Sequence, residues 1–206
     1  WKTNRKNEVF RLLHGRSNVY LIPSDQGHIM IDTSIRSDYN LLKRRLNLLH
    51  LAHPSIEYLI LTHTHFDHCQ NASRLQKEYK CRIITSSHET THTVNGYTPL
   101  PEGRNSFSRF LIDMGKKLDK KWFSYEPFNA DITVENKLVI YDSDLSVRVI
   151  NTPGHSMGSV SVLIDEEIAL VGDIMIGILK NSILPPFADD PKELVRSWGA
   201  LLKTDC

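Results

Sequence analysis

The sequence is richest in chemically capable side chains at residues 63–68, which read HTHFDH. In extended backbone, alternate side chains project to the same side, so we expect His63, His65 and Asp67 to point into one crevice. His68 can then serve a second ion. Imidazole and carboxylate groups suit zinc, and also iron or manganese. Surface or capping histidines are the alternative interpretation, but this spacing favours a metal site.

Two later stretches offer further ligands. In the run 151–156, which reads NTPGHS, an expected strand ends in a Pro-Gly turn that would expose His155. In the run 171–173, which reads VGD, the carboxylate of Asp173 directly follows an apolar strand. Each signal alone is more typical of an ordinary turn residue. Combined with the run 63–68, they complete a plausible metal site.

The element before the histidine run supports its placement at a ligand-accessible edge. Residues 58–62 form a short, mostly apolar run of the kind expected for a buried strand. In layered α/β proteins, side chains just beyond the carboxyl end of a strand face a crevice. We therefore expect the histidines to border such a crevice.

Hydrophobic periodicity and turn residues predict the remaining elements. Strands are expected over 9–13, 18–22, 28–32, 82–85, 137–141, 147–151, 159–164 and 168–171. Helices are expected from the cap Ser37 to before Pro54, over 71–79, and from the cap Asp190 to about Leu202. This order predicts an α/β fold in one domain spanning residues 1–206.

Residues 88–130 are expected to form a helical insertion. Its apolar side chains recur on one helical face: Phe107, Phe110, Leu111, Met114, Leu118 and Trp122. Packing of this face against the body is the favoured interpretation, and a lid that shapes substrate access is the alternative. The nearby lysines, Lys116, Lys117, Lys120 and Lys121, indicate a solvated helix face rather than an anion site.

A competing motif lies at residues 88–92, which read HETTH and match the zinc-binding pattern H-E-x-x-H. That pattern requires both histidines on one face of a helix. The threonines, with Gly96 and Pro99 close behind, disfavour such a helix. We therefore assign the metal site to residues 63–68.

Charge and composition narrow the partners. The 206 residues carry 25 basic and 24 acidic side chains, for a net charge of +1. No global field points to nucleic acid or a membrane, so we expect a small-molecule substrate, and any charge-driven partner would need a local patch. The sequence leaves the possibility of a homo-oligomer open. The three cysteines and the absence of a signal segment or long apolar run favour a cytoplasmic protein, although a leader could have preceded Trp1.

In combination, HTHFDH at 63–68, TPGHS at 152–156 and GD at 172–173 resemble the metallo-β-lactamase superfamily. Ile31-Asp32-Thr33 resembles the early strand-ending aspartate of that family, so the resemblance covers almost the whole chain. It implies a four-layer αβ/βα sandwich with metals at one edge. The ligands it implies are divided between two zinc ions: His63, His65 and His155 on the first, Asp67 and His68 on the second, and Asp173 between them.

The resemblance also implies a mechanism. Water held between the two ions would lose its proton near neutral pH and attack the substrate. Asp67 would orient this nucleophile or take its proton, and Asp32 would support the ligands without binding metal.

One feature departs from the family pattern. Members usually carry a further histidine in a PGHG-like stretch, and none occurs before Cys206. We expect a truncated fold that lacks its last strand and helix. The alternatives are a mononuclear site, or a second site completed by solvent or another chain.

The sequence indicates the substrate class only coarsely. Asp173, rather than cysteine, at the bridging position resembles thioesterases and lactonases, whereas Thr64 stands where glyoxalase II-like enzymes usually have histidine. We expect hydrolysis of an ester, thioester, lactone or related bond. A mononuclear iron enzyme resembling persulfide dioxygenases and a non-catalytic metal-binding module are the alternatives.

Overall fold

Ten strands form two sheets in the computed structural model, which describes residues 1–49, 55–177, 182–204 and 206. The first sheet contains, in spatial order, β1 (Phe10–Leu13), β2 (Val19–Ile22), β3 (His28–Ile31), β4 (Ile56–Ile60), β5 (Arg82–Ser86) and β6 (Ile132–Val134). The second contains β10 (Ile168–Leu170), β9 (Val160–Ile164), β8 (Leu145–Asn151) and β7 (Lys137–Asp142). Strands β3 to β6 pair in parallel, and all pairs of the second sheet are antiparallel.

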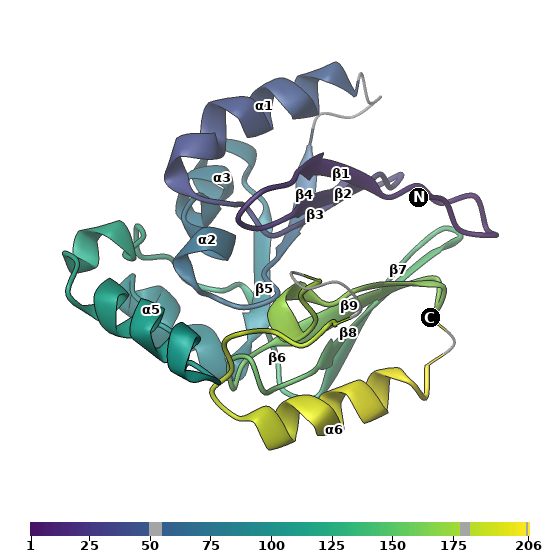
Figure 1. Cartoon of the computed structure of the whole chain (residues 1–206). Helices are drawn as coiled ribbons and strands as arrows, with labels where there is room; N and C mark the ends of the chain where they lie inside the picture. The colour runs from purple at the N-terminus through teal and green to yellow at the C-terminus, as the bar shows by residue number, and fades with distance from the viewer. Residues whose placement is uncertain (50–54, 178–181, 205) are drawn as a thin grey trace.

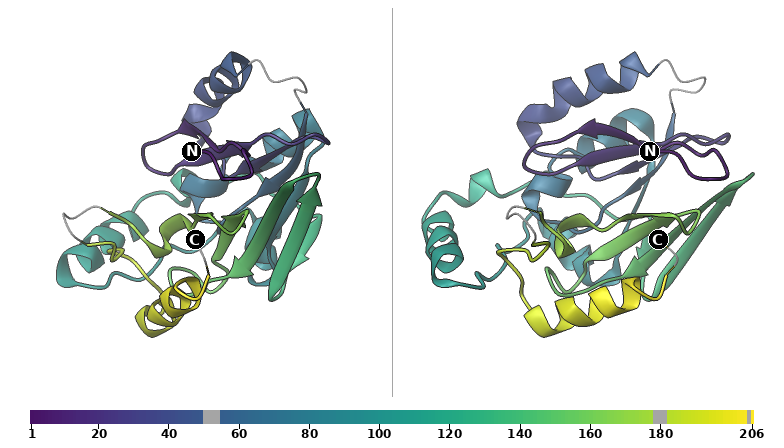
Figure 2. Two further views of the ribbon diagram at one scale, coloured as in Figure 1. Left: turned by 90° about the vertical axis from the view of Figure 1, so that its right-hand side faces the viewer. Right: turned by 45° about the vertical axis from the view of Figure 1, so that its right-hand side comes forward.

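The helices form the outer layers of the molecule. They are α1 (Tyr39–Leu48), α2 (Phe66–Cys69), α3 (Ala72–Tyr79), α4 (Thr90–Asn95), α5 (Ser106–Lys116) and α6 (Pro191–Leu201). Helices α1 and α3 lie outside the first sheet, and α6 lies outside the second (Figures 1 and 2). The predicted α/β class and αβ/βα layering are confirmed.

Alternation along the central strands explains the layering. In β3, Met30 packs under the outer helices, whereas Ile29 and Ile31 face the second sheet. In β4 the same alternation separates Leu59 from Ile60. Side chains of a strand alternate between faces, so a run that is apolar throughout is buried on both. The parallel strands therefore require both a helical layer and the second sheet.

Helix α6 begins as its sequence predicts. The Asp190 carboxylate accepts hydrogen bonds from the backbone N–H groups of Lys192 and Glu193, and Pro191 occupies the first turn. On its inner face, Leu194 is fully buried, and the indole of Trp198 donates to the carbonyl of Ile174 at 2.8 Å. The cap fixes the start of the helix, and this packing holds the helix against the second sheet.

Several local predictions are wrong. The strand predicted over 58–62 is β4, which begins and ends two residues earlier. Ser37 does not cap a helix, because it lies inside a short 3-10 turn at Arg36–Asp38 that leads into α1. The predicted end of this helix, before Pro54, falls at residues 50–54, outside the described residues. Two short elements, α2 and β6, were not predicted.

The segment between β5 and β6 contains α4, α5 and a 3-10 turn at Lys120–Trp122. The apolar face predicted to pack against the body is exposed instead, with Phe107 at 71% and Trp122 at 72% exposure. Helix α5 buries Ser108 and Ile112, which lie on a neighbouring side of the helix. The packing interpretation is therefore wrong for this face.

Within residues 1–49, 55–177, 182–204 and 206, no helix is both long and apolar enough to cross a membrane.

Candidate metal centre

Four chain segments meet at one edge of the sandwich. Asp32 follows β3, the histidine run follows β4, and both lie at the carboxyl ends of neighbouring parallel strands. The turn with His155 follows β8, and Asp173 lies in a 3-10 turn after β10. Parallel pairing thus brings together side chains that are far apart in the sequence.

Three histidines converge at this edge. The ligand atoms of His63, His65 and His155 lie within 4.8 Å of one another, and all three side chains are buried. Nδ1 of His65 lies 3.0 Å from Nε2 of His155. Nε2 of His63 is buried and has no hydrogen-bond partner. A buried, unpaired ring nitrogen is costly, so the group is suited to hold an ion.

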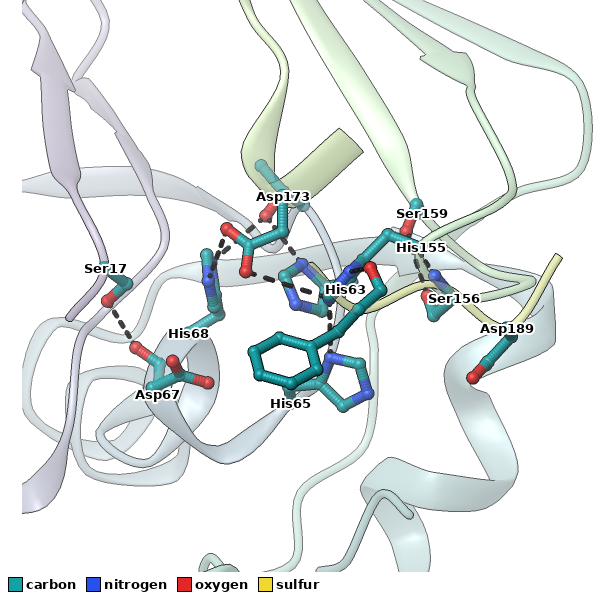
Figure 3. Close-up of polar contacts among 12 residues, drawn as sticks. Ser17, His63, His65, Asp67, His68, His155, Ser156, Ser159, Asp173 and Asp189 are labelled. Atoms are coloured by element: carbon teal, nitrogen blue, oxygen red, sulfur yellow. Dashed lines mark hydrogen bonds and ion pairs between the residues drawn. The ribbon is translucent and has the colours of Figure 1, made fainter. Parts of the chain in front are cut away.

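A second group shares one of these histidines. Ligand atoms of His63, His68 and Asp173 also lie within 4.8 Å of one another. The two carboxylate oxygens of Asp173 lie 3.3 Å from Nε2 of His68 and 3.7 Å from Nε2 of His155. Asp173 therefore stands between the two groups (Figure 3).

Asp67 is placed differently from the sequence expectation. Residues 66–69 form α2 rather than extended backbone, so the alternation that joins His63 and His65 does not extend to Asp67. Its carboxylate belongs to neither ligand group of the described residues, although it borders the cavity and lies beside His68 (Figure 3). Burial raises the pKa of the Asp67 carboxyl.

The pKa values of three of the proposed histidine ligands shift in two opposite directions. Burial and neighbouring imidazoles lower the pKa values of His63 and His65 well below the usual range, which favours the neutral, metal-binding form. Burial also opposes charge on His68, but Asp173 and Asp32 raise its pKa well above the usual range. Burial would likewise raise the pKa of Asp173, and His68, His155 and His65 together lower it.

Asp32 organises the start of the histidine run. Its Oδ1 accepts the backbone N–H of Thr62 at 2.8 Å, and its Oδ2 accepts the Thr62 hydroxyl at 2.7 Å. The same Oδ2 lies 2.8 Å from Nδ1 of His68, so its carboxylate orients that ring and leaves Nε2 toward Asp173. This geometry matches the supporting role that the resemblance implies.

Two glycines allow the loops to approach closely. Gly172 has φ +55°, and an added Cβ would lie 2.8 Å from Oγ1 of Thr62. Gly154 has φ +137°, and an added Cβ would lie 2.4 Å from Cα of Leu194 in α6. The carbonyl of Phe187 lies 3.1 Å from Nδ1 of His155 and is suited to orient its ring.

Glu89 supports the site from behind and was not predicted to do so. Its carboxylate, 2% exposed, accepts the hydroxyls of Thr64 and of Ser156, the latter at 2.7 Å. It thus joins the histidine run to the turn that carries His155. Contrary to expectation, residues 90–95 are helical, but His88 is exposed and no metal-binding group of the described residues includes it.

Cys69 lies immediately behind the ligands. Its buried thiol donates to the carbonyl of Thr64 at 3.2 Å, and burial raises its pKa well above the usual range. The neutral thiol therefore packs as a small apolar group and holds the backbone of the histidine run.

A cavity of about 640 Å³ opens over the ligands. Its wall combines the polar side chains of the metal centre and of Arg16, Ser17 and Asn18 with a set of apolar side chains. The apolar lining includes Phe66, Leu100, Leu111, Ile112, Phe123 and Phe187. A ligand with a polar reacting group and an apolar body fits this combination.

The comparisons with known proteins agree with this geometry. A family model described as the metallo-beta-lactamase superfamily matches residues 13–196. A probable metallo-hydrolase of Methanocaldococcus jannaschii is 28% identical over 157 residues, covering 76% of this chain and 66% of that protein. A hydroxyacylglutathione hydrolase of Rhodopseudomonas palustris is 26% identical over 112 residues, covering 54% of this chain and 31% of that protein.

Solved structures show the same fold. A beta-lactamase from Chitinophaga pinensis matches with a TM-score of 0.67 and 18% identity, over 94% of this chain and 71% of that one. The chain spans less than two thirds of the length of the curated relatives it matches, at 66% and 31%. Because the family model extends over most of the sequence and its expected histidines converge in space, the chain belongs to the metallo-beta-lactamase superfamily.

Proposed function

We propose that this protein is a metal-dependent hydrolase that cleaves an ester, thioester or lactone bond. The observation that carries the proposal is the convergence of His63, His65 and His155 beside His68 and Asp173, four of which, all but His63, line an open cavity. Five buried or half-buried ligand groups at one sheet edge exceed what the fold needs for stability. Family membership supports the same reaction class.

The donor set fits zinc. Imidazole nitrogens and a carboxylate suit this ion, and the resemblance implies two zinc ions. We assign His63, His65 and His155 to one ion, His68 to the other, and Asp173 to both. Asp67, which the resemblance places on the second ion, lies outside both ligand groups of the described residues, so we assign it to proton transfer. When bound, the metal would activate water as a nucleophile and polarise the scissile carbonyl.

The protein's own groups would then position and move protons. Asp67 borders the cavity, and burial raises its carboxyl pKa, so it is suited to accept a proton at a carboxylate oxygen. Asp32 holds the ring of His68 through Nδ1. Glu89 and the carbonyl of Phe187 fix the two loops that present His65 and His155.

An acyl thioester is the substrate class that we favour. The Rhodopseudomonas palustris relative is named for hydrolysing hydroxyacylglutathione, an acyl thioester. The apolar cavity wall formed by Leu111, Ile112 and Phe123 would receive the acyl group, and the carbonyl would face the histidines.

Metal analysis combined with a substrate panel tests the proposal. We expect purified protein to bind zinc and to hydrolyse at least one member of a panel of thioesters, lactones and simple esters. His63→Ala and His155→Ala should lose both zinc and activity, whereas His88→Ala, which changes an exposed histidine, should retain both.

Two results would contradict it. Stoichiometric iron without zinc, together with oxygen consumption on a persulfide, would favour the iron enzyme. Zinc binding without hydrolysis of any substrate in the panel would favour the non-catalytic module.

A further inference from the structure

Helix α5 and the turn that follows it carry an apolar face without a partner in the described chain. Its side chains are strongly exposed: Phe107 at 71%, Phe110 at 59%, Met114 at 52%, Leu118 at 56% and Trp122 at 72%. We call these five residues the apolar stripe. The helix lies at the outer margin of the molecule (Figure 1). Scattered apolar residues are ordinary on a surface, but a contiguous stripe with two aromatic rings on one helix marks a contact site.

The exposure of the stripe does not come from a misplaced helix α5, because another side of the helix packs against the body. Helix α5 is already anchored through Ser108 and Ile112, and an added Cβ at Gly115 would lie 3.0 Å from Leu100. Asn105 and Ser108 form a capping box that fixes the first turn. Body contacts thus occupy one side of the helix and leave the stripe outward.

Positive charge surrounds the stripe. Residues 104–123 contain six basic side chains and only two acidic ones, although the whole chain carries only +1. Lys116, Lys117, Lys120 and Lys121 are all exposed. Lys116 approaches Glu102 only at 3.8 Å, so most of this charge faces solvent. The local patch that a charge-driven partner requires is therefore present.

We propose that the apolar stripe and its lysines bind the surface of an anionic lipid bilayer. Aromatic and aliphatic side chains would enter the headgroup region, while the lysines would reach the lipid phosphates. A second copy of this chain fits less well. A symmetric contact through the stripe would bring two basic patches together, whereas anionic lipid neutralises them.

The stripe also lies beside the catalytic cavity. Leu111, at the border of the stripe, lines the cavity together with Ile112, Gly115 and Phe123. Resting on the proposed function, this continuity would let an acyl chain pass from a bilayer to the metal centre. Bilayer binding itself requires no activity, so the two proposals can fail separately.

Vesicle co-sedimentation tests the proposal on the full chain. We expect binding to vesicles of phosphatidylcholine mixed equally with phosphatidylglycerol, weak binding to phosphatidylcholine alone, and weaker binding as salt rises. Lys117→Glu with Lys121→Glu should weaken binding by about thirtyfold or more. Phe110→Ser with Trp122→Ser should abolish it.

Matched variants on α6 and at the end of the chain serve as controls. Lys192→Glu with Lys203→Glu makes the same change in net charge, and Val195→Ser with Leu202→Ser removes two other exposed apolar side chains. Both controls should bind as the parent does. Equal binding to both vesicle types, or equal loss in the controls, would overturn the proposal. A dimer in sedimentation velocity that Phe110→Ser with Trp122→Ser dissociates would instead assign the stripe to a second copy.

Discussion

Glu89 shows how a single buried carboxylate can hold two loops that both carry histidines. It accepts hydroxyls from Thr64, beside His63 and His65, and from Ser156, beside His155. Gly158 leaves room for it, since an added Cβ there would lie 2.4 Å from its Cγ. Mutation of groups that orient metal ligands in this way commonly weakens metal binding by about 10- to 100-fold.

We predict that Glu89→Ala weakens zinc binding by about 10- to 100-fold, because both loops lose their common acceptor. Competition with a chromophoric chelator measures the change. Glu89→Gln keeps one acceptor oxygen and should recover part of the affinity. His88→Ala changes the adjacent exposed residue and should bind zinc as the parent does. Parental affinity in Glu89→Ala would remove Glu89 from the site.

Asp67 has two proposed roles that a single substitution separates. Its carboxylate lies outside both ligand groups, so we predict that Asp67→Asn lowers kcat by about 10²- to 10⁴-fold while zinc content changes little. Steady-state kinetics and metal analysis of the same preparation measure both. Loss of one zinc equivalent would instead assign Asp67 chiefly as a ligand, and a parental kcat would exclude the proton-transfer role.

At the scale of elements, α6 links the second sheet to the metal centre. Leu194 packs against Gly154, the residue before His155, so the helix supports the turn that carries this ligand. The Asp190 cap determines where the helix begins. Stability of α6 and geometry of the site are therefore coupled.

Asp190→Ala removes this cap, and we predict a loss of about 1 kcal/mol in the free energy of unfolding. Urea denaturation monitored by circular dichroism measures it. Asp190→Asn, which keeps a side-chain oxygen for the same N–H groups, should lie close to the parent. A parental midpoint for Asp190→Ala would show that packing alone determines this helix terminus.

Sequence patterns predicted the helices and strands that depend on local signals or on apolar patterning. Residues 28–32 and 82–85 were predicted as strands from hydrophobic patterning and neighbouring turn residues, and β3 and β5 confirm this. Helix α2 was missed because tertiary contacts hold it: the carbonyl of His68 accepts from Thr33, and that of Asp67 from Ser17. Strand β6 has three residues, too few for a periodic signal.

The face of α5 was misassigned for a different reason. Helical periodicity shows that one side of a helix is apolar, but not which side contacts the body. Similarly, the spacing of residues 63–68 predicts a metal site, while local patterns cannot bring His155 and Asp173 to it. Their juxtaposition depends on strand pairing across the whole chain. Their positions after expected strands suggested it, and the family resemblance assigned them to the site.

At the scale of the molecule, the proposed ligands belong to both halves of the sandwich. His63, His65 and His68 follow the first sheet, whereas His155 and Asp173 follow strands of the second. A bound ion would therefore add a further link between two sheets that already meet at this edge through apolar packing, through the Glu89 hydrogen bonds and through the Val160 N–H, which donates to the Thr62 carbonyl at 2.8 Å.

We predict that zinc stabilises the whole fold. At a free concentration 100 times its Kd, one ion should add about 2.7 kcal/mol to the free energy of unfolding. Thermal denaturation in zinc and in excess chelator measures the difference. His63→Ala should show little difference between the two conditions. An equal midpoint for the parent protein in zinc and in chelator would contradict metal binding at the sheet edge.

Because Cys69 is buried, the rate at which its thiol is modified reports how often the metal centre opens. Its thiol lies directly after His68 and beneath the backbone of Thr64, so a thiol reagent can reach it only when the histidine run opens. Cys206 is exposed and should react at once, whereas Cys81 is buried as Cys69 is, so time separates Cys206 and mass spectrometry of the labelled peptides separates Cys69 from Cys81. The slow modification of Cys69 would therefore count spontaneous openings of the site, and a tightly held ion would lengthen the interval between them.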